Sequence, residues 1–127
     1  MVIIRYYKVI VLQILFLIIF ASCSSISPEE AQEIQEMAEG QEVLLIDVRE
    51  PSEFAEGHIP GAINVPLDRL VDEIGSIAHG FNQEILIICR SGARSRGATG
   101  VLETMGYTNL TDVGGILDWT GEIVMPQ

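Results

Sequence analysis

Apolar residues along the chain follow two periodicities, which predict helices that alternate with strands. The expected elements, in chain order, are a helix from Ser27-Pro28 to Gly40, a strand over Val43–Ile46, a short helix over Pro51–Glu56, a strand over Ala62–Val65, a helix marked by Leu67, Leu70, Val71 and Ile74, a strand over Glu84–Ile88, a helix over Arg94–Met105, a strand over Asn109–Val113 and a short helix over Ile116–Trp119. This alternation predicts an α/β domain with a central, mainly parallel sheet and helices on both faces.

The N-terminal residues have the pattern of an export signal and not of a folded domain. Arg5 and Lys8 precede a dense apolar run over Val9–Phe20, and the small residues Ala21-Ser22 follow it. A positive region, an apolar stretch of ~7–15 residues and small residues before a cleavage point are typical of a secretory signal peptide. The run is short for a membrane-spanning helix, which needs ~20 residues. We therefore expect a signal peptide over residues 1–22.

The residues up to Cys23 resemble the lipobox of bacterial lipoproteins, although Phe20 stands where that family prefers Leu. In lipoproteins this Cys is lipid-modified and becomes the first residue of the mature chain. The resemblance implies a lipid anchor at Cys23, a domain over residues 24–127, and a location on the extracytoplasmic face of the cell membrane or in the periplasm. An uncleaved signal anchor and a plain secreted protein are the alternatives, and both export the domain.

Composition and charge narrow the choice of function. A chain of 127 residues, 48% hydrophobic and 20% charged, fits one globular domain. The 18 acidic residues against 7 basic ones give a net charge of −11, which argues against a nucleic-acid partner. Against this acidic background, Arg90, Arg94 and Arg96 form one basic spot. No cluster of side chains has metal-ligand spacing, so we expect neither a metal nor a cofactor.

The segment Cys89–Ser95 holds the candidate chemistry, because it joins the most apolar predicted strand to a helix. Ligands in open α/β sheets bind beyond the carboxyl ends of the strands, and a tight turn at Gly92 can aim backbone N–H groups at an anion. A helix N-terminus and nearby arginines lower the pKa of a thiol, so Cys89 is the candidate nucleophile. The alternative is a buried, inert Cys89 that ends an apolar strand. The arginines directly after it argue against such burial.

Four motifs, in order over about Ile26 to Trp119, resemble the signatures of the rhodanese-like sulfurtransferases. They are Asp47-Val48-Arg49-Glu50 with Glu53-Phe54, the segment Gly57–Pro66, the loop Cys89–Ser95, and Gly114-Gly115 followed by Trp119. The resemblance implies the family's five-stranded α/β fold. It also implies a persulfide mechanism, in which Cys89 takes sulfane sulfur from a small anionic donor such as thiosulfate. The acceptor would be a thiol, a cyanide-like nucleophile or a protein thiol.

The loop residues are the candidate substrate-binding groups, namely Arg90, Ser91, Gly92, Ala93, Arg94 and Ser95. Their backbone N–H groups are expected to stabilise the persulfide anion. The Arg90 and Arg94 guanidinium groups can hold the donor's oxygens in a fork, although Arg94 is as well suited to bracing the loop. Ser91 and Ser95 can donate to the persulfide or cap the following helix, and capping is favoured for Ser95.

Asp47 and Arg49 follow a predicted strand, so they lie on the same edge as the loop. They either shape the electrostatics of the pocket or form a structural charge pair that ties neighbouring loops, and we favour the charge pair. His58 lies in a turn rich in Gly and Pro, where a histidine more often satisfies backbone groups than acts as a base.

Two other functions compete with sulfur transfer by an enzyme. Phosphatases also use a Cys-and-Arg loop after a buried strand, but theirs is Cys-x5-Arg, whereas Cys89 to Arg94 is Cys-x4-Arg. The shorter loop suits a sulfur atom better than a phosphate. The second competitor is a membrane-tethered sulfur carrier or sensor that loads a protein partner without turnover, because one fold can serve many functions.

Overall fold

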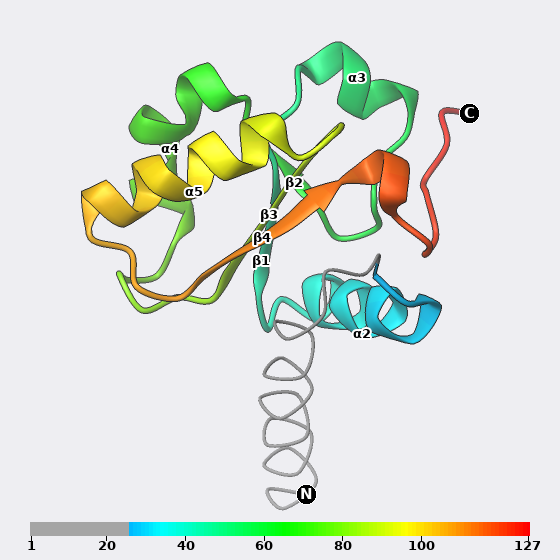
Figure 1. Cartoon of the computed structure of the whole chain (residues 1–127), viewed down its shortest axis with the longest axis horizontal. Coiled ribbons are helices and arrows are strands. Elements are labelled where there is room, and N and C mark those ends of the chain that lie inside the picture. Colours follow the sequence, from blue (N-terminus) through cyan, green and yellow to red (C-terminus); the bar gives the residue numbers. More distant parts are fainter. Residues whose placement is uncertain (1–25) are drawn as a thin grey trace, which may run out of the picture.

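Four parallel strands form the sheet of this protein (Figure 1). The computed structural model describes residues 26–127, and within them the strands are β1 (Leu44–Asp47), β2 (Ile63–Asn64), β3 (Ile85–Cys89) and β4 (Leu110–Gly115). Their order in the sheet is β2-β1-β3-β4. The expected α/β fold with a parallel sheet is confirmed, and the described residues supply four of the five strands that the family resemblance implies.

The helices follow the predicted alternation closely. They are α2 (Pro28–Glu39), α3 (Pro51–Glu56), α4 (Leu70–Ile77) and α5 (Ala93–Met105), with short 3-10 helices η1 (Leu67–Arg69) and η2 (Ile116–Asp118). Local chemistry explains where α2 begins, because the Ser27 hydroxyl accepts the N–H of Glu30 while the Glu30 carboxylate accepts the N–H of Ser27. Leu70, Val71 and Ile74 all lie in α4; Leu70 and Ile74 face the core, whereas Val71 is 54% exposed.

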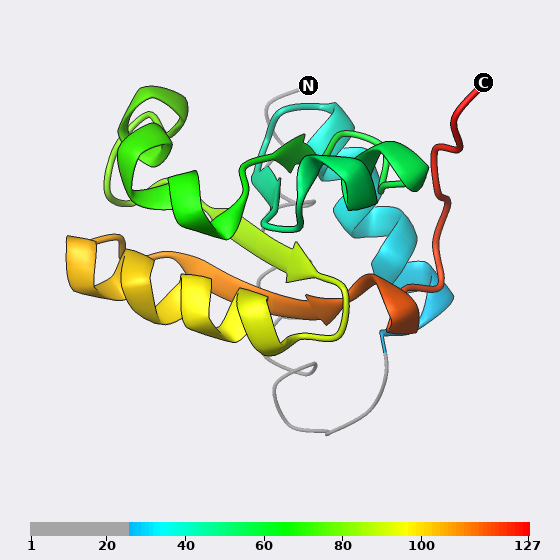
Figure 2. The ribbon, with the colours of Figure 1, turned by 90° about the horizontal axis from the view of Figure 1, so that it is seen from above.

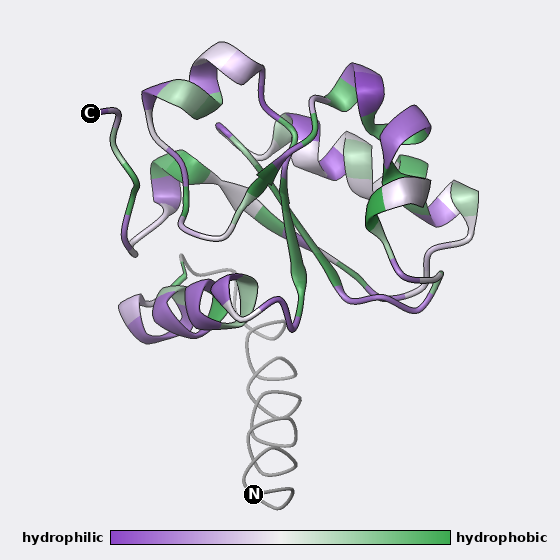
Figure 3. Cartoon of the chain, turned by 180° about the vertical axis from the view of Figure 1, so that it is seen from behind, coloured by the Kyte–Doolittle hydropathy of each residue, from purple (hydrophilic) through white to green (hydrophobic). Residues whose placement is uncertain are grey.

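The sheet separates two apolar clusters, one on each face. On one face, Ile46, Ile85 and Ile87 pack with residues of α4 and α5. On the other face, Leu45 and Leu86 pack with residues of α2. Figure 2 shows α4 and α5 along the sheet from above, and Figure 3 shows the apolar strands between helices that mix polar and apolar residues. Alternation of side chains along each strand produces this division.

The expected signal peptide over residues 1–22 and the lipid anchor at Cys23 lie outside the described residues. Within residues 26–127, no helix combines the length and apolar character that crossing a bilayer requires.

Candidate active site

The ends of all four strands meet at one edge of the sheet, because the strands are parallel. Asp47 ends β1, Cys89 ends β3 and Gly115 ends β4. A β-bulge in β4 sets the position of its last residues, since Ile87 pairs with Asp112 but the next residue, Ile88, pairs with Gly114. Through this bulge Gly115 lies opposite Cys89.

Glycine at the end of β4 allows the loop after Cys89 to lie close against the strand. A Cβ atom at Gly115 would lie 2.7 Å from Cα of Ser91, a distance that side chains do not tolerate. The loop is held there by the N–H of Leu117, which donates to the carbonyl of Arg90 over 3.2 Å. At the far end of the loop, Gly92 has a φ of +100° and begins α5 as its N-cap. The backbone of this loop therefore depends on two glycines far apart in the sequence.

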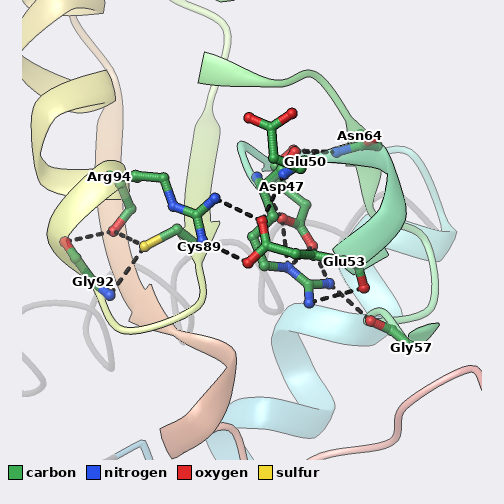
Figure 4. Close-up of polar contacts among 10 residues, drawn as sticks. Asp47, Glu50, Glu53, Gly57, Asn64, Cys89, Gly92 and Arg94 are labelled. Carbon is green, nitrogen blue, oxygen red and sulfur yellow. Dashed lines mark hydrogen bonds and ion pairs between the residues drawn. The ribbon is translucent and has the colours of Figure 1, made fainter. Parts of the chain in front are cut away.

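The sulfur of Cys89 lies at the N-terminus of α5, where it accepts the Gly92 N–H and donates to the Ser95 hydroxyl (Figure 4). The N–H of Gly92 is 3.0 Å from Sγ, and the Ser95 hydroxyl oxygen is 3.5 Å from it. Burial raises the pKa of the Cys89 thiol, but hydrogen bonds from the Ser95 side chain and from the backbone of Ser95, Gly92 and Arg94 lower it by more. The net pKa lies below the ordinary value for a thiol, which favours the thiolate.

Cys89 is nevertheless fully buried, with 0% of the residue exposed. The expectation that the neighbouring arginines would keep it out of the interior was wrong. Arg90 and Arg96 are exposed, and Arg94 turns away to a partner on α3. Because the long cationic side chains leave the loop in other directions, they do not prevent burial of the short thiol between them. Cys89 is thus both buried and acidic, whereas the sequence analysis offered a buried, inert cysteine and a reactive one as alternatives.

Ser95 does not cap α5, contrary to the expectation. The N-cap is Gly92, and the buried Ser95 side chain faces the sulfur and two carbonyls instead. Its hydroxyl oxygen lies 3.0 Å from the Gly92 carbonyl and 3.2 Å from the Gly114 carbonyl. A hydroxyl has one hydrogen, so it donates either to a carbonyl or to the thiolate. Ser95 can therefore accept from the thiol S–H and donate to the thiolate, which suits both protonation states.

Arg94 forms a two-pronged ion pair with Glu53 of α3. Nη1 of Arg94 is 2.7 Å from Oε2 of Glu53, and Nη2 is 2.8 Å from Oε1. The hydrogen bonds from Arg94 lower the pKa of Glu53 to about 2, and Glu53 in turn raises the pKa of Arg94. In Figure 4 the Arg94 guanidinium lies against Glu53, on the side facing away from Gly92. Arg94 was expected either to contact the donor or to brace the loop, and Glu53 is the partner that bracing requires.

The remaining loop side chains are open to the solvent. Arg90, Ser91 and Ala93 are exposed, and Gly92 is half-buried. Within residues 26–127 the Arg90 side chain forms neither an ion pair nor a hydrogen bond, so its guanidinium is available to an incoming anion.

Asp47 and Arg49 form a buried ion pair beside the site, which is the arrangement expected of a structural charge pair. Nε of Arg49 is 3.0 Å from both carboxylate oxygens of Asp47, and Nη2 is 2.8 Å from Oδ2. Arg49 also donates to the carbonyls of Glu53, at 3.2 Å, and Gly57, at 2.8 Å. The Asn64 side chain donates to the carbonyls of Asp47 and Arg49. This network joins the ends of β1 and β2 to both ends of α3.

His58 satisfies backbone and aromatic neighbours and does not reach the sulfur through any contact in the described part of the chain. Its Nδ1 is 3.0 Å from the carbonyl of Phe54, and its ring stacks on the Phe54 ring with centroids 3.8 Å apart. Among residues 26–127, no group of three or more His, Cys, Asp or Glu side chains could hold a metal ion.

Glu53 is the site residue that sequence reasoning missed. Glu53 belongs to the first motif, but the sequence does not indicate its role, because its partner lies 41 positions away. One local signal existed: the carboxylate of Glu53 accepts the N–H of Glu50 at the start of α3. That signal explains a helix cap and gives no hint of Arg94.

Comparisons with known proteins agree with the fold. The family model of the Rhodanese-like domain matches residues 30–122. A sulfurtransferase of Allochromatium vinosum is 37% identical over 97 residues, which cover 73% of this chain and 89% of that protein. Thiosulfate sulfurtransferase PspE of Escherichia coli is 35% identical over 82 residues, which cover 65% of this chain and 75% of that protein.

A solved structure of a rhodanese with anions from E. coli is also similar. It has a TM-score of 0.62 and 33% sequence identity, and the match covers 65% of this chain and 96% of that one. With the family model spanning the strands, the Cys89 loop and the Glu53–Arg94 pair, the chain belongs to the rhodanese-like domain family.

Proposed function

We propose that this chain transfers sulfane sulfur from a thiosulfate-like donor to a thiophilic acceptor through a persulfide on Cys89. The coarser assignment, a sulfurtransferase of the rhodanese type, follows from the family and from relatives that carry this activity in their names. The observation that carries the finer proposal is the Cys89 sulfur, which accepts the Gly92 N–H over 3.0 Å at the start of α5. Preorganised donors of this kind stabilise a sulfur anion in both the thiolate and the persulfide state.

In the first half-reaction the Cys89 thiolate attacks the outer sulfur of thiosulfate. A new S–S bond forms to Cys89, the bond between the two sulfurs of thiosulfate breaks, and sulfite leaves with its electron pair. The product on Cys89 is a persulfide anion, so no proton is needed from the protein. The exposed Arg90 guanidinium is the group suited to hold the donor's oxygens.

In the second half-reaction a nucleophile attacks the outer sulfur of the persulfide. With cyanide the products are thiocyanate and the Cys89 thiolate, which returns the enzyme to its starting state. A thiol acceptor leaves with a persulfide of its own. Because the enzyme is modified between the two substrates, the kinetics should be ping-pong.

The location of this activity is a separate proposal. The sequence of residues 1–22 and the lipobox-like Cys23 support export with a lipid anchor, which would hold the domain at the extracytoplasmic face of the membrane. Metabolic labelling with a radioactive fatty acid tests it: label on the wild type but not on Cys23→Ser is expected. Label on neither would overturn the lipid anchor.

Intact mass before and after thiosulfate tests the sulfur transfer. The full chain with Cys23→Ser has Cys89 as its one cysteine. We expect a gain of one sulfur atom, which cyanide reverses and which Cys89→Ser lacks. If Cys89 stays unmodified by thiosulfate while an alkylating reagent still reaches it, thiosulfate transfer is refuted. The carrier or sensor function, in which a protein partner loads the sulfur, would then replace it.

A further inference from the structure

Glu53 occupies the guanidinium of Arg94, one of the two arginines of the loop Cys89–Ser95. Both terminal nitrogens of Arg94 are held by the two carboxylate oxygens of Glu53, at 2.7 and 2.8 Å. Arg94 is the second residue of α5 and its backbone is among the groups that hydrogen-bond Sγ of Cys89. The carboxylate of Glu53 therefore stands where the oxygens of an anionic donor would otherwise meet the Arg94 fork.

The ion pairs around the site leave little positive charge for a donor. Arg49 is neutralised by Asp47, and Arg94 is neutralised by Glu53. Within the described residues, the one loop cation with neither an ion pair nor a side-chain hydrogen bond beside the sulfur is Arg90. Arg90 is thus the loop cation left to meet a donor, and the protein around it is strongly acidic.

We propose that Glu53 sets the charge preference for the sulfur donor by holding Arg94 in its ion pair. This inference rests on the proposed sulfur transfer and adds a determinant of which donors are used. With the pair intact, a dianionic donor meets one free guanidinium and a nearby carboxylate. A monoanionic donor suffers half the repulsion from that carboxylate, because the energy scales with the charge of the donor.

The alternative is that Glu53 only supports the loop. Glu53 accepts the N–H of Glu50 at 2.8 Å and so also helps to begin α3. Gln at this position keeps the size and one acceptor oxygen, so it preserves most of the cap while removing the charge. A supporting role would alter the rate with every donor alike, whereas a charge role changes the ratio between donors.

Two donors of different charge separate these roles. Thiosulfate is a dianion, and benzenethiosulfonate is a monoanion that also breaks an S–S bond and releases an oxygenated sulfur anion. For the full chain in detergent, we expect Glu53→Gln to raise the ratio of kcat/KM, thiosulfate over benzenethiosulfonate, by about five- to tenfold. The gain should come mainly from a lower KM for thiosulfate.

Two further variants make the test specific. Glu56→Gln removes one negative charge from the exposed end of the same helix, α3, where the carboxylate makes no contact with Arg94. This control should leave the donor ratio within twofold of the wild type. The double variant Glu53→Gln with Arg94→Gln removes one charge of each sign, so its ratio should return towards the wild-type value.

An unchanged donor ratio in Glu53→Gln, or an equal loss of kcat with both donors, would overturn the inference and leave Glu53 as a supporting residue. A double variant that keeps the raised ratio would also overturn it, because the effect would then not pass through Arg94. These results differ from failure of the proposed function, in which the wild type itself forms no persulfide with either donor.

Discussion

Replacing Ser95 by Ala tests how the structure acidifies the Cys89 thiol. The Ser95 hydroxyl is 3.5 Å from Sγ, and the change removes this hydrogen bond without touching the Gly92 N–H at 3.0 Å. Hydrogen bonds to charged groups are worth about 1.5–3 kcal/mol, and the long separation favours the low end, about 1.5 kcal/mol. That energy corresponds to about a tenfold smaller thiolate fraction well below the pKa.

Alkylation of Cys89 by iodoacetamide across a range of pH reports the thiolate fraction. We expect the rate for Ser95→Ala to be about tenfold below the wild type at low pH and to converge with it at high pH, where both thiols are ionised. Ser91→Ala is the matched control, because Ser91 belongs to the same loop but is exposed. Coincident profiles for Ser95→Ala and the wild type would refute this reasoning and assign the acidity to the backbone N–H groups alone. A uniform change at every pH would instead mean altered access to the sulfur.

Three other substitutions follow from the contacts around the site. Arg49→Met leaves the Asp47 carboxylate buried without its partner and should lower the free energy of unfolding by about 3–5 kcal/mol in urea titrations; a loss below 1 kcal/mol would contradict this. Gly115→Ala forces the loop away from β4, so persulfide formation should fall at least tenfold while far-UV circular dichroism stays native; normal persulfide yield would refute the need for close approach. The Glu53–Arg94 pair stabilises the fold above pH 4.5, and this contribution is lost as the pH falls towards the Glu53 pKa of about 2. Since the pair is partly exposed, Glu53→Gln should cost about 1 kcal/mol at pH 7 and less at pH 3, and a pH-independent difference would contradict the assignment.

The elements and their order were predictable because they rest on local patterns. The run Ile85–Ile88 predicts a buried strand, and Ser27-Pro28 predicts a helix start, without knowledge of any distant residue. The position of Cys89 before a helix N-terminus follows from the same local reasoning, as does its candidacy as the nucleophile.

What the sequence did not reveal depends on where side chains turn after the chain folds. From its position in the sequence alone, Arg94 could either face the donor or brace the loop. Only the placement of α3 in the fold brings Glu53 to the Arg94 guanidinium. The burial of Cys89 was misjudged for the same reason, since the direction of the neighbouring arginines was unknown. The bulge that moves Gly114 into register beside Ile88 likewise leaves no periodic signal in the sequence.

The Cys89 thiol is both acidic and buried, and these two properties have opposite effects on its reactivity. Acidity makes Cys89 a thiolate at lower pH, whereas complete burial keeps solutes from the sulfur. Because 0% of Cys89 is exposed, a donor reaches Sγ only when covering atoms move. The loop that follows Cys89 is held by the hydrogen bond from Leu117 to the carbonyl of Arg90 and by the ion pair of Arg94 with Glu53.

A shielded thiolate of this kind is selective in a way that an exposed one is not. An oxidant that collides at random would find no accessible sulfur, whereas a donor held at Arg90, as proposed above, would already lie beside the loop. For the proposed sulfur transfer, we therefore expect the rate to depend on access to Sγ as well as on the thiolate fraction.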